Sequence, residues 1–361
     1  MNFDFHIELG KITPKIAEGA KIYILGAKSS WEHICNQYKH LVNVDLNIFI
    51  DGFIVNDKND QNNVFCDKPV YTLSEIEIMN AVILISSPSY SDSTYEMARQ
   101  LSSCGMFWRH SYFTSEIFMT ILMRYEYQRM LKFQNVHKNK RCFIVGNGPS
   151  LTTGDLDKIK DEISFGSNEV YLLYEKTSWR PSYYVIHDSD RLKRIQNQIH
   201  ENINCPRFYA FNSVFDIEPF FMNGEFDYFY YLDGIVDWFP LKDYSPDFSS
   251  NPFKLSWGAT VTYDAIQLAF YMGFSEIHLL GMDHDYAFMI NTKGDLITRD
   301  VASDNFSSKY TPSVHPLMVD LVDASYENAN EYAKKHGIKI YNATRGGKLE
   351  MFERIDFDAL F

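Results

Sequence analysis

The sequence has no C-x-x-C pair and no other clustered cysteines. Its five cysteines are scattered along the chain, and three of them lie in or beside apolar runs. This distribution argues against a zinc site, and it predicts reduced, mostly buried thiols in a cytoplasmic protein.

Long hydrophobic runs are also missing. No stretch approaches the roughly 18 apolar residues of a membrane span. The first residues, M-N-F-D-F-H-I-E-L-G, have neither a basic n-region nor an apolar h-region. We therefore expect a cytoplasmic protein without a transmembrane segment. Peripheral contact with the inner membrane stays open, although the sequence shows no amphipathic basic helix.

Acidic residues outnumber basic ones, and the formal net charge is therefore −13. Broad nucleic-acid binding needs clustered Lys and Arg, so no nucleic-acid partner is expected, although Arg191, Lys193 and Arg194 form a local basic cluster. The composition, with 45% hydrophobic and 22% charged residues, is typical of a folded protein. The length of 361 residues predicts two domains. The many aromatic residues are interpreted as core, with a stacking platform for bases or sugars as the alternative.

The chain is organised around Arg141 to Leu151, which reads R-C-F-I-V-G-N-G-P-S-L. Apolar residues suited to a strand run into a glycine turn, and Ser150 stands where an N-cap would start a helix. Gly146 and Gly148, on either side of Asn147, would let backbone amides approach a phosphate. The stretch lacks the third glycine of a dinucleotide motif and the lysine of a P-loop, so a purely structural turn is the alternative.

The first part of the chain alternates short apolar strands with helices. The expected strands include Lys21–Ala27, Leu46–Ile50 and Ala81–Ile85. Asp51 follows the second of these strands, where a dinucleotide-binding fold would hold a ribose. Because the first turn reads G-A-K-S-S-W, a structural or acceptor-binding domain is favoured over nucleotide binding here.

A long helical pattern from Thr114 to about Asn135 joins the two halves. The sequence therefore predicts an α/β protein with two Rossmann-like domains and mainly parallel sheets, divided into residues 1–135 and 136–361.

Polar side chains follow several strands of the second half. Asn168 comes after Ile163–Gly166, and His187 and Asp188 come after Ser182–Ile186. In open α/β sheets, ligands bind at these carboxyl ends of the strands.

The later part of the second half repeats this arrangement. A helix is expected from Gly258 to Met272, then a strand over Glu276–Leu280, then Asp283 and Asp285. A polar excursion over residues 291–314 has few helix or strand signals and is interpreted as a lid. An amphipathic helix from about Leu317 to His336 follows it.

Residues 140–350 of this sequence resemble a known family. The motifs that carry the resemblance are G-N-G-P-S-L at 146–151, S-N-E at 167–169, G-A-T-V-T-Y-D-A-I at 258–266, G-F-S-E-I-H-L-L-G-M-D at 273–283 and K-I-Y-N-A-T-R-G-G-K-L-E at 339–350. They look like the domain-of-unknown-function 115 group, which is labelled 6-hydroxymethylpterin diphosphokinase-like and includes motility accessory factors that glycosylate flagellin. The order of motifs is also similar to that of bacterial lipooligosaccharide sialyltransferases, which are inverting enzymes with CMP-activated donors. The resemblance implies a sialyltransferase-like glycosyltransferase domain in the C-terminal half.

The resemblance also implies roles for particular residues. Asn147 and Asn168 would lie near the donor phosphate and sugar, Gly258 would contact the nucleotide, and His315 would be the catalytic histidine. The expected nucleotide- or donor-binding residues are Gly146, Asn147, Gly148, Ser150, Asn168, His187, Asp188, Gly258, Ala259, Asp283, Asp285 and Tyr286. The chain departs from the sialyltransferases at Lys254 or Leu255, at His187 and at Asp285, so the identity of the donor sugar stays open.

The chemistry of glycosyl transfer needs a base for the acceptor hydroxyl and positive or amide groups for the leaving phosphate. A histidine such as His315 suits the first task because its pKa lies close to neutral pH, and capping of the following helix is its structural alternative. The pairs Asp188 and Asp190, and Asp283 and Asp285, could hold Mg²⁺ if the donor is a diphosphate. A CMP-sugar needs no metal, and no cofactor is expected.

These observations favour a glycosyltransferase that moves a nonulosonic acid from a CMP donor to a bacterial surface glycan, glycolipid or protein. The alternatives are an ATP- and Mg²⁺-dependent pterin diphosphokinase-like enzyme and a non-catalytic nucleotide-sugar-binding assembly protein. The acceptor, the linkage and the formation of a homo-oligomer stay open.

Overall fold

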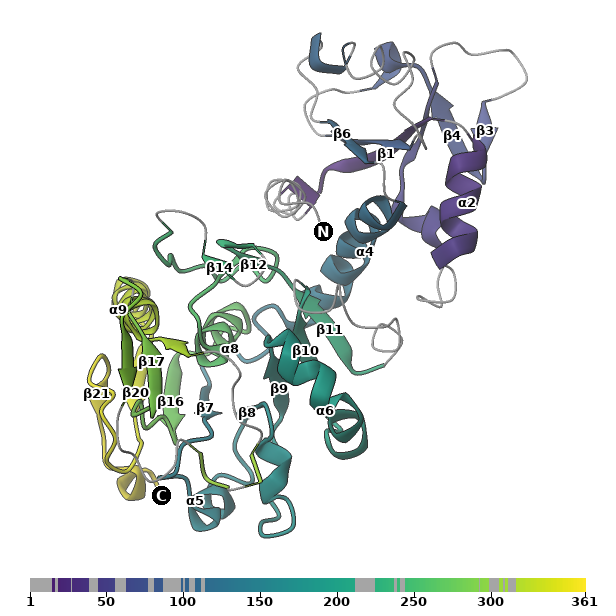
Figure 1. Cartoon of the computed structure of the whole chain (residues 1–361). Helices are drawn as coiled ribbons and strands as arrows, with labels where there is room; N and C mark the ends of the chain where they lie inside the picture. The colour runs from purple at the N-terminus through teal and green to yellow at the C-terminus, as the bar shows by residue number, and fades with distance from the viewer. Residues whose placement is uncertain are drawn as a thin grey trace. The chain divides into compact units, whose positions relative to one another are not determined.

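The structure is a computed structural model of the whole chain (Figure 1). The residues it describes are 15–16, 19–26, 28–38, 45–55, 63–76, 81–86, 99, 101–103, 108–111, 114–211, 225–236, 239–240, 244–291, 293–298, 305–307, 309–310 and 316–361. They divide into two compact units, one up to Arg129 and one from Met130 onward. The division falls at the end of helix α4 (Thr114–Met130), within the long helical stretch that the sequence predicts. That each unit is a separate domain stays a prediction.

The first unit contains a six-stranded sheet in the order β3-β4-β2-β1-β5-β6. Its strands are β1 (Lys21–Gly26), β2 (Gly52–Ile54), β3 (Val64–Phe65), β4 (Lys68–Tyr71), β5 (Ala81–Ser86) and β6 (Trp108–Ser111). All neighbouring pairs are parallel except the β3/β4 hairpin. Numbered along the chain, the parallel strands lie in the order 3-2-1-4-5, which is the order of a Rossmann half-sheet. Helix α2 (Lys28–Tyr38) follows β1.

Two expectations for this unit are wrong. Residues Leu46–Phe49 form a short 3-10 helix rather than a strand, because the Asp45 carboxylate accepts a hydrogen bond from the Asn47 amide and caps the turn. Asp51 therefore precedes strand β2 instead of following it. Its carboxylate accepts the amide N–H of Ile22 at 2.8 Å and pairs with Arg124. Asp51 thus lies at the amino end of the sheet, away from the place of a ribose-binding acid.

The second unit contains an eight-stranded sheet in which every neighbouring pair is parallel. Its strands are β7 (Arg141–Val145), β8 (Ser164–Ser167), β9 (Tyr183–Ile186), β10 (Arg207–Ala210), β11 (Asp227–Tyr230), β16 (Glu276–Leu280), β20 (Lys339–Asn342) and β21 (Glu353–Arg354). The α/β class and the mainly parallel sheets are confirmed. Strand β10 was not expected from the sequence, because its first residue, Arg207, is charged. In the fold the Arg207 guanidinium is buried and pairs with Asp227 at 2.6 Å.

The chain builds this sheet outward from β7 in two directions. The spatial order is β11-β10-β9-β8-β7-β16-β20-β21, so the direction reverses between β7 and β16. Ligands of open α/β sheets bind beside such a switch point, at the carboxyl ends of the strands. We call that edge of the eight-stranded sheet the carboxyl edge.

Helices of the second unit pack on the eight-stranded sheet. They are α5 (Thr153–Lys158), α6 (Ser189–Asn202), α8 (Val261–Tyr271) and α9 (Val319–His336). Helix α8 packs across β7, β8 and β9, and α9 lies beside α8 and β20 (Figure 1). Because α8 precedes the parallel strand β16, its amino end lies at the carboxyl edge. The end of α9 at Gly337, with φ 69°, is the one predicted from the sequence.

Smaller elements complete the described chain. The two-stranded pairs are β12 (Leu232–Asp233) with β15 (Leu255–Ser256) and β13 (Ile235–Val236) with β14 (Phe239–Pro240), and a three-stranded sheet contains β17 (Phe288–Ile290), β18 (Leu296–Thr298) and β19 (Leu317–Met318). The 3-10 helices are η1 (Leu46–Phe49), η2 (Leu73–Glu75), η4 (Leu131–Phe133), η5 (Val170–Leu173) and η7 (Phe357–Leu360). Strand β18 lies inside the polar excursion, in a stretch where the sequence shows few helix or strand signals.

Aromatic side chains supply much of the core, as expected. The largest fully buried side chains include Trp31, Trp179, Tyr184, Tyr209 and Tyr230. The prediction of mostly buried thiols is met only in part. Cys142 is buried, whereas Cys35, Cys66 and Cys205 are partly exposed free thiols. Among the helices of the described residues, none combines the length and the apolar character that a membrane crossing requires.

Candidate functional site

The glycines after β7 allow two backbone segments to meet at the switch point. The Gly146 amide donates to the Leu280 carbonyl at 2.8 Å, and the Gly148 amide donates to the Gly281 carbonyl at 3.0 Å. A Cβ atom on Gly146 would lie 2.4 Å from the Gly281 carbonyl oxygen, and one on Gly148 would lie 1.9 Å from a carboxylate oxygen of Asp283. Both glycines are therefore explained by close backbone approach between β7 and β16.

Asp283 holds the turn that follows. Its carboxylate oxygen Oδ2 accepts the Ser150 hydroxyl at 2.7 Å and the Ser150 amide at 3.3 Å. Ser150 is consequently not an N-cap. The helix α5 begins at Thr153 and is capped by Thr152, so the expected helix start at Ser150 is wrong. Because the amides of residues 146, 148 and 150 already have protein acceptors, the glycine turn has fewer free donors for a phosphate than the sequence suggests.

Two asparagines lie beside this turn at the carboxyl edge. The Asn147 side-chain amide donates to the carbonyl and hydroxyl oxygens of Ser167, at 3.3 and 3.2 Å. Its Oδ1 atom is buried, and among the described residues it has no hydrogen-bond partner. Asn168, directly after β8, accepts the Tyr184 hydroxyl on its carbonyl at 2.8 Å. A buried oxygen of this kind needs a hydrogen-bond donor, which a bound ligand could supply.

Left-handed backbone conformations gather at the ends of these elements. Asn168, Ala259 and His284 have φ values of 51°, 56° and 53°. They stand after β8, before α8 and after β16. For a residue with a Cβ atom this conformation costs on the order of 1 kcal/mol, and such strain is concentrated at functional sites. Ala259, which has no side chain to hydrogen-bond locally, is the clearest case.

His187, directly after β9, pairs with an acid on α8. Its Nδ1 lies 2.7 Å from Oδ2 of Asp264, and the Tyr230 hydroxyl donates to the same oxygen at 2.6 Å. Asp264 is fully buried. Burial lowers the pKa of His187, but the charge and the hydrogen bond of Asp264, followed by the charge of Asp188, raise it, and the net shift of the pKa is upward.

The turn into α8 is tightly packed. A Cβ on Gly258 would lie 2.4 Å from the Tyr263 ring and 2.5 Å from the Ser325 hydroxyl oxygen, which itself donates to the Gly258 carbonyl. Packing therefore explains this glycine. Thr260 then caps α8 by accepting the Thr262 amide.

The acidic pairs are engaged by protein groups. Asp188 caps α6 by accepting the Arg191 amide at 2.9 Å, and Asp285 pairs with Lys348 at 2.8 Å. Asp283 binds Ser150, as described above. Within the part of the chain that the structure describes, no group of three or more His, Cys, Asp or Glu side chains could hold a metal ion. Mg²⁺ binding by Asp188 with Asp190, or by Asp283 with Asp285, stays a prediction, as does donor binding by Tyr286.

Part of the predicted lid contacts the carboxyl edge. The Phe306 amide donates to the Asn147 carbonyl at 3.0 Å. The Tyr310 ring lies 4.8 Å below the Arg191 guanidinium, and its hydroxyl bonds to Asn168. Burial raises the pKa of Tyr310 to about 12, so this phenol stays neutral. His315, the predicted catalytic histidine, lies outside the described residues.

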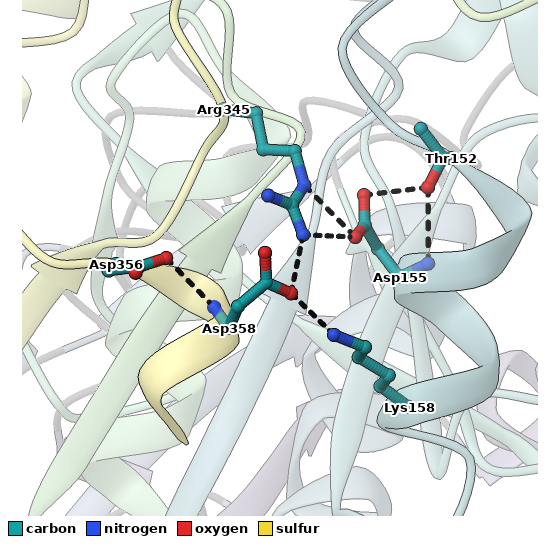
Figure 2. Close-up of polar contacts among 6 residues, drawn as sticks. All are labelled: Thr152, Asp155, Lys158, Arg345, Asp356 and Asp358. Carbon is teal, nitrogen blue, oxygen red and sulfur yellow. Dashed lines mark hydrogen bonds and ion pairs between the residues drawn. The ribbon is translucent and has the colours of Figure 1, made fainter. Parts of the chain in front are cut away.

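An ion network ties the carboxyl end of β20 to α5 (Figure 2). Arg345 donates from Nε and Nη2 to one carboxylate oxygen of Asp155, at 3.1 and 3.0 Å, and from Nη2 to Asp358 at 2.7 Å. Lys158 also pairs with Asp358. Thr152, the cap of α5, donates its hydroxyl to Asp155. The network therefore holds the helix that follows the glycine turn against the C-terminal 3-10 helix.

Replacing Arg345 by alanine is expected to lower the free energy of unfolding by about 1 kcal/mol, because it leaves the buried Asp155 carboxylate with one partner fewer while solvent screens the rest. The measurement is urea unfolding followed by circular dichroism. Lys335→Ala, at an exposed position of α9, is the control and should leave the midpoint unchanged; equal midpoints for both variants would contradict the role of Arg345.

The Arg345 and Lys158 hydrogen bonds also lower the pKa of Asp358. The ionised Asp358 carboxylate therefore stabilises the folded chain at neutral pH. This stabilisation is lost as the pH falls through the lowered pKa.

Comparison with known protein families identifies the region that contains this site. Residues 119–288 match the family described as 6-hydroxymethylpterin diphosphokinase MptE-like. Residues 119–288 are similar to the MptE-like family. This match confirms the resemblance to the 6-hydroxymethylpterin diphosphokinase-like group that the sequence motifs indicate. The MptE-like region includes the glycine turn, Asn168, His187 and the start of α8, and it ends before His315.

A search of solved structures finds the MAf glycosyltransferase from Magnetospirillum magneticum AMB-1. The identity is 14% and the TM-score 0.40, over 78% of this chain and 49% of that protein. The chain thus spans about half the length of that protein. No curated protein matches the chain.

Four residues of this edge were not selected from the sequence. Tyr230 and Asp264 sit inside an aromatic strand and an apolar helix, and Arg191 and Tyr310 lie in a basic cluster and in the lid segment. The sequence signal for Asp264 is an acid within an otherwise apolar helical stretch, since a buried carboxylate needs partners. The donor-binding roles of the expected residues stay predictions.

Proposed function

We propose that this chain is a glycosyltransferase that binds a nucleotide-activated sugar at the carboxyl edge of the eight-stranded sheet. The observation that carries the proposal is the convergence at the switch point. Asn147, Asn168, His187 and the amino end of α8 belong to four different elements, and they all lie at the edge where open α/β sheets bind ligands.

The donor phosphate would meet groups suited to an anion. The amino end of α8 carries partial positive charge, and His187 beside it has a raised pKa. The polar oxygen of Asn147 is suited to a sugar hydroxyl or a cytosine amino group. These contacts favour a donor with a single phosphate, such as a CMP-nonulosonic acid, over a metal-bridged diphosphate.

The reaction would be a single inverting displacement. The acceptor oxygen attacks the anomeric carbon, the bond from that carbon to the phosphate oxygen breaks, and the electron pair leaves with CMP. His315 would accept the acceptor's proton. The acceptor would be a bacterial surface glycan, glycolipid or protein.

A pterin diphosphokinase is the second candidate, because the matched family is described by that activity. It would use the same edge to bind ATP, with Mg²⁺ on the acidic pairs. Such a metal site would require Asp188, Asp283 or Asp285 to release its present protein partner. This requirement favours glycosyl transfer.

A product assay separates the candidates. The purified chain is incubated with a CMP-nonulosonic acid, UDP- and GDP-sugars, or ATP with Mg²⁺ and 6-hydroxymethylpterin, and the released nucleotides are quantified. CMP release without a metal supports the proposal. AMP formation that depends on the pterin and Mg²⁺ would overturn it, and binding without any turnover would indicate a non-catalytic assembly protein.

A further inference from the structure

His284, in the segment that follows β16, combines two unfavourable features. Its backbone is left-handed, with φ 53°, which costs free energy in a residue with a Cβ atom. Its side chain is 9% exposed, and its buried Nδ1 atom has no hydrogen-bond partner within the part of the chain that the structure describes. Such costs persist only where the surroundings hold the residue in place, and they are concentrated at functional sites.

Helix α9 supplies the contacts that hold His284. The Nε2 atom lies 2.7 Å from Oδ1 of Asp323, and because a carboxylate accepts hydrogen bonds, Nε2 is the donor. One turn further along α9, the Tyr326 ring packs against the imidazole at a centroid distance of 5.9 Å. The Tyr286 ring stands edge-on to the imidazole at 5.8 Å. Asp323 therefore fixes the direction of a ring that two tyrosines enclose.

The residue before His284 connects this segment to the glycine turn after β7. Oδ2 of Asp283 accepts the Ser150 hydroxyl at 2.7 Å and the Ser150 amide at 3.3 Å, and the Asp283 carbonyl accepts the Lys348 amide at 2.7 Å. The backbone of His284 sets where the Asp283 carboxylate points, because the two residues share a peptide bond. A shift of His284 would consequently move the glycine turn that contains Asn147.

Helix α9 also contacts the start of α8. The Ser325 hydroxyl donates to the Gly258 carbonyl at 3.2 Å, and the Tyr326 hydroxyl bonds to Thr260, the cap of α8. Ala259, between Gly258 and Thr260, is the other strained residue here, with φ 56°. The first half of α9 therefore contacts both left-handed segments beside the amino end of α8.

We propose that Asp323 is a positioning residue for the donor site at the carboxyl edge. The inference rests on the proposed function. Asp323 holds the His284 ring, His284 holds the segment that carries Asp283, and Asp283 holds the glycine turn beside Asn147. A site whose parts are already in place binds its ligand more tightly, because binding does not have to order them.

The first test needs no ligand. Amide hydrogen exchange is followed by mass spectrometry in peptides that cover residues 146–151. The Ser150 amide bonds to Asp283, and its exchange should be about 5- to 30-fold faster in Asp323→Ala, the factor for a local loss of one weak interaction. Glu327→Ala removes an acid at an exposed position of the same helix and should exchange as wild type. Equal exchange of residues 146–151 in the two variants would overturn the inference.

The second test is the affinity for CMP, measured by isothermal titration calorimetry at a temperature where every variant is folded. Asp323→Ala should bind CMP about 5- to 30-fold more weakly than wild type. Asp323→Asn keeps an oxygen that accepts the Nε2 proton, so it should recover part of the affinity. A purely structural role would lower the Tm and leave the Kd for CMP unchanged, and this result would overturn the inference.

A double substitution checks that Asp323 acts through His284. His284→Gly adopts the left-handed backbone without strain and lacks the ring. Adding Asp323→Ala to His284→Gly should weaken CMP binding no further, because the interaction is already lost. Independent effects of the two substitutions would overturn the route through His284. If Asp323→Ala does not fold, Asp323→Asn and Glu327→Gln replace the alanine pair in every comparison.

The outcomes separate this inference from the proposed function. If the wild-type chain binds CMP, and Asp323→Ala binds it as tightly as Glu327→Ala does, the role of Asp323 is overturned and nucleotide binding stands. If the wild-type chain binds no nucleotide, the proposed function is overturned. The exchange of residues 146–151 then still decides whether Asp323 holds the glycine turn.

Discussion

Gly146→Ala is expected to lower the free energy of unfolding by about 1 to 3 kcal/mol, the cost of overpacking a closely packed site. The new Cβ would lie 2.4 Å from the Gly281 carbonyl oxygen and 2.6 Å from the Met282 sulfur. The first of these is backbone, which cannot rotate away as a side chain can. The strands β7 and β16 would have to separate, and the hydrogen bond from the Gly146 amide to Leu280 would be strained.

Gly154→Ala is the matched control for this substitution. Gly154 lies in α5, and the nearest atom to its added Cβ, the Thr152 hydroxyl oxygen, is 3.8 Å away. Alanine there should stabilise the chain by about 0.4 to 1 kcal/mol, because it restricts the unfolded state and favours the helix. Differential scanning calorimetry should show a lower Tm for Gly146→Ala and an equal or higher Tm for Gly154→Ala. Equal values for the two variants would contradict the close approach at the switch point.

His315→Ala is expected to reduce glycosyl transfer by about 10²- to 10⁴-fold, the usual contribution of a general base. The alanine side chain cannot accept the acceptor proton. The affinity for the nucleotide should stay within about threefold of the wild-type value if the imidazole contacts the acceptor rather than the donor. The measurement is the initial rate of CMP release in the presence of acceptor, together with the Kd for CMP.

His336→Ala controls for the general loss of a histidine. Its ring is exposed, and it bonds to the carbonyl and stacks on the ring of Tyr332 in its own helix, so transfer should be unchanged. A His315→Ala variant that retains full activity would show that the residue serves only to cap the helix that follows Pro316. A variant that loses nucleotide binding as well would place His315 at the donor instead.

Local sequence patterns were sufficient to predict the main strands of the second unit. β7, β8, β9, β16 and β20 are short apolar runs that end in glycine or polar residues, and this is the pattern of buried parallel strands. The alternation of strands with helices was enough to predict the parallel sheets. The position of the switch point was not predicted, since it depends on which side of β7 the strand β16 joins.

Long-range partners account for what the sequence did not predict. Ser150 has the residue type of an N-cap, but Asp283, distant in the sequence, binds both its amide and its hydroxyl. Asp264 is an ordinary helix residue by local rules, and its importance follows only from His187 and Tyr230 on two other elements. Such pairings are fixed by the tertiary fold, which a single sequence does not specify locally.

The central claim is that the carboxyl edge of the eight-stranded sheet binds a nucleotide donor. The most direct test is a thermal-shift screen of the whole chain against CMP, CDP, UDP, GDP and ATP, each with and without Mg²⁺. A ligand at 100 times its Kd stabilises the folded state by about 2.7 kcal/mol, which raises the Tm by several degrees. We predict stabilisation by CMP or CDP without Mg²⁺. Stabilisation only by ATP with Mg²⁺, or by none of the five nucleotides, would contradict this account.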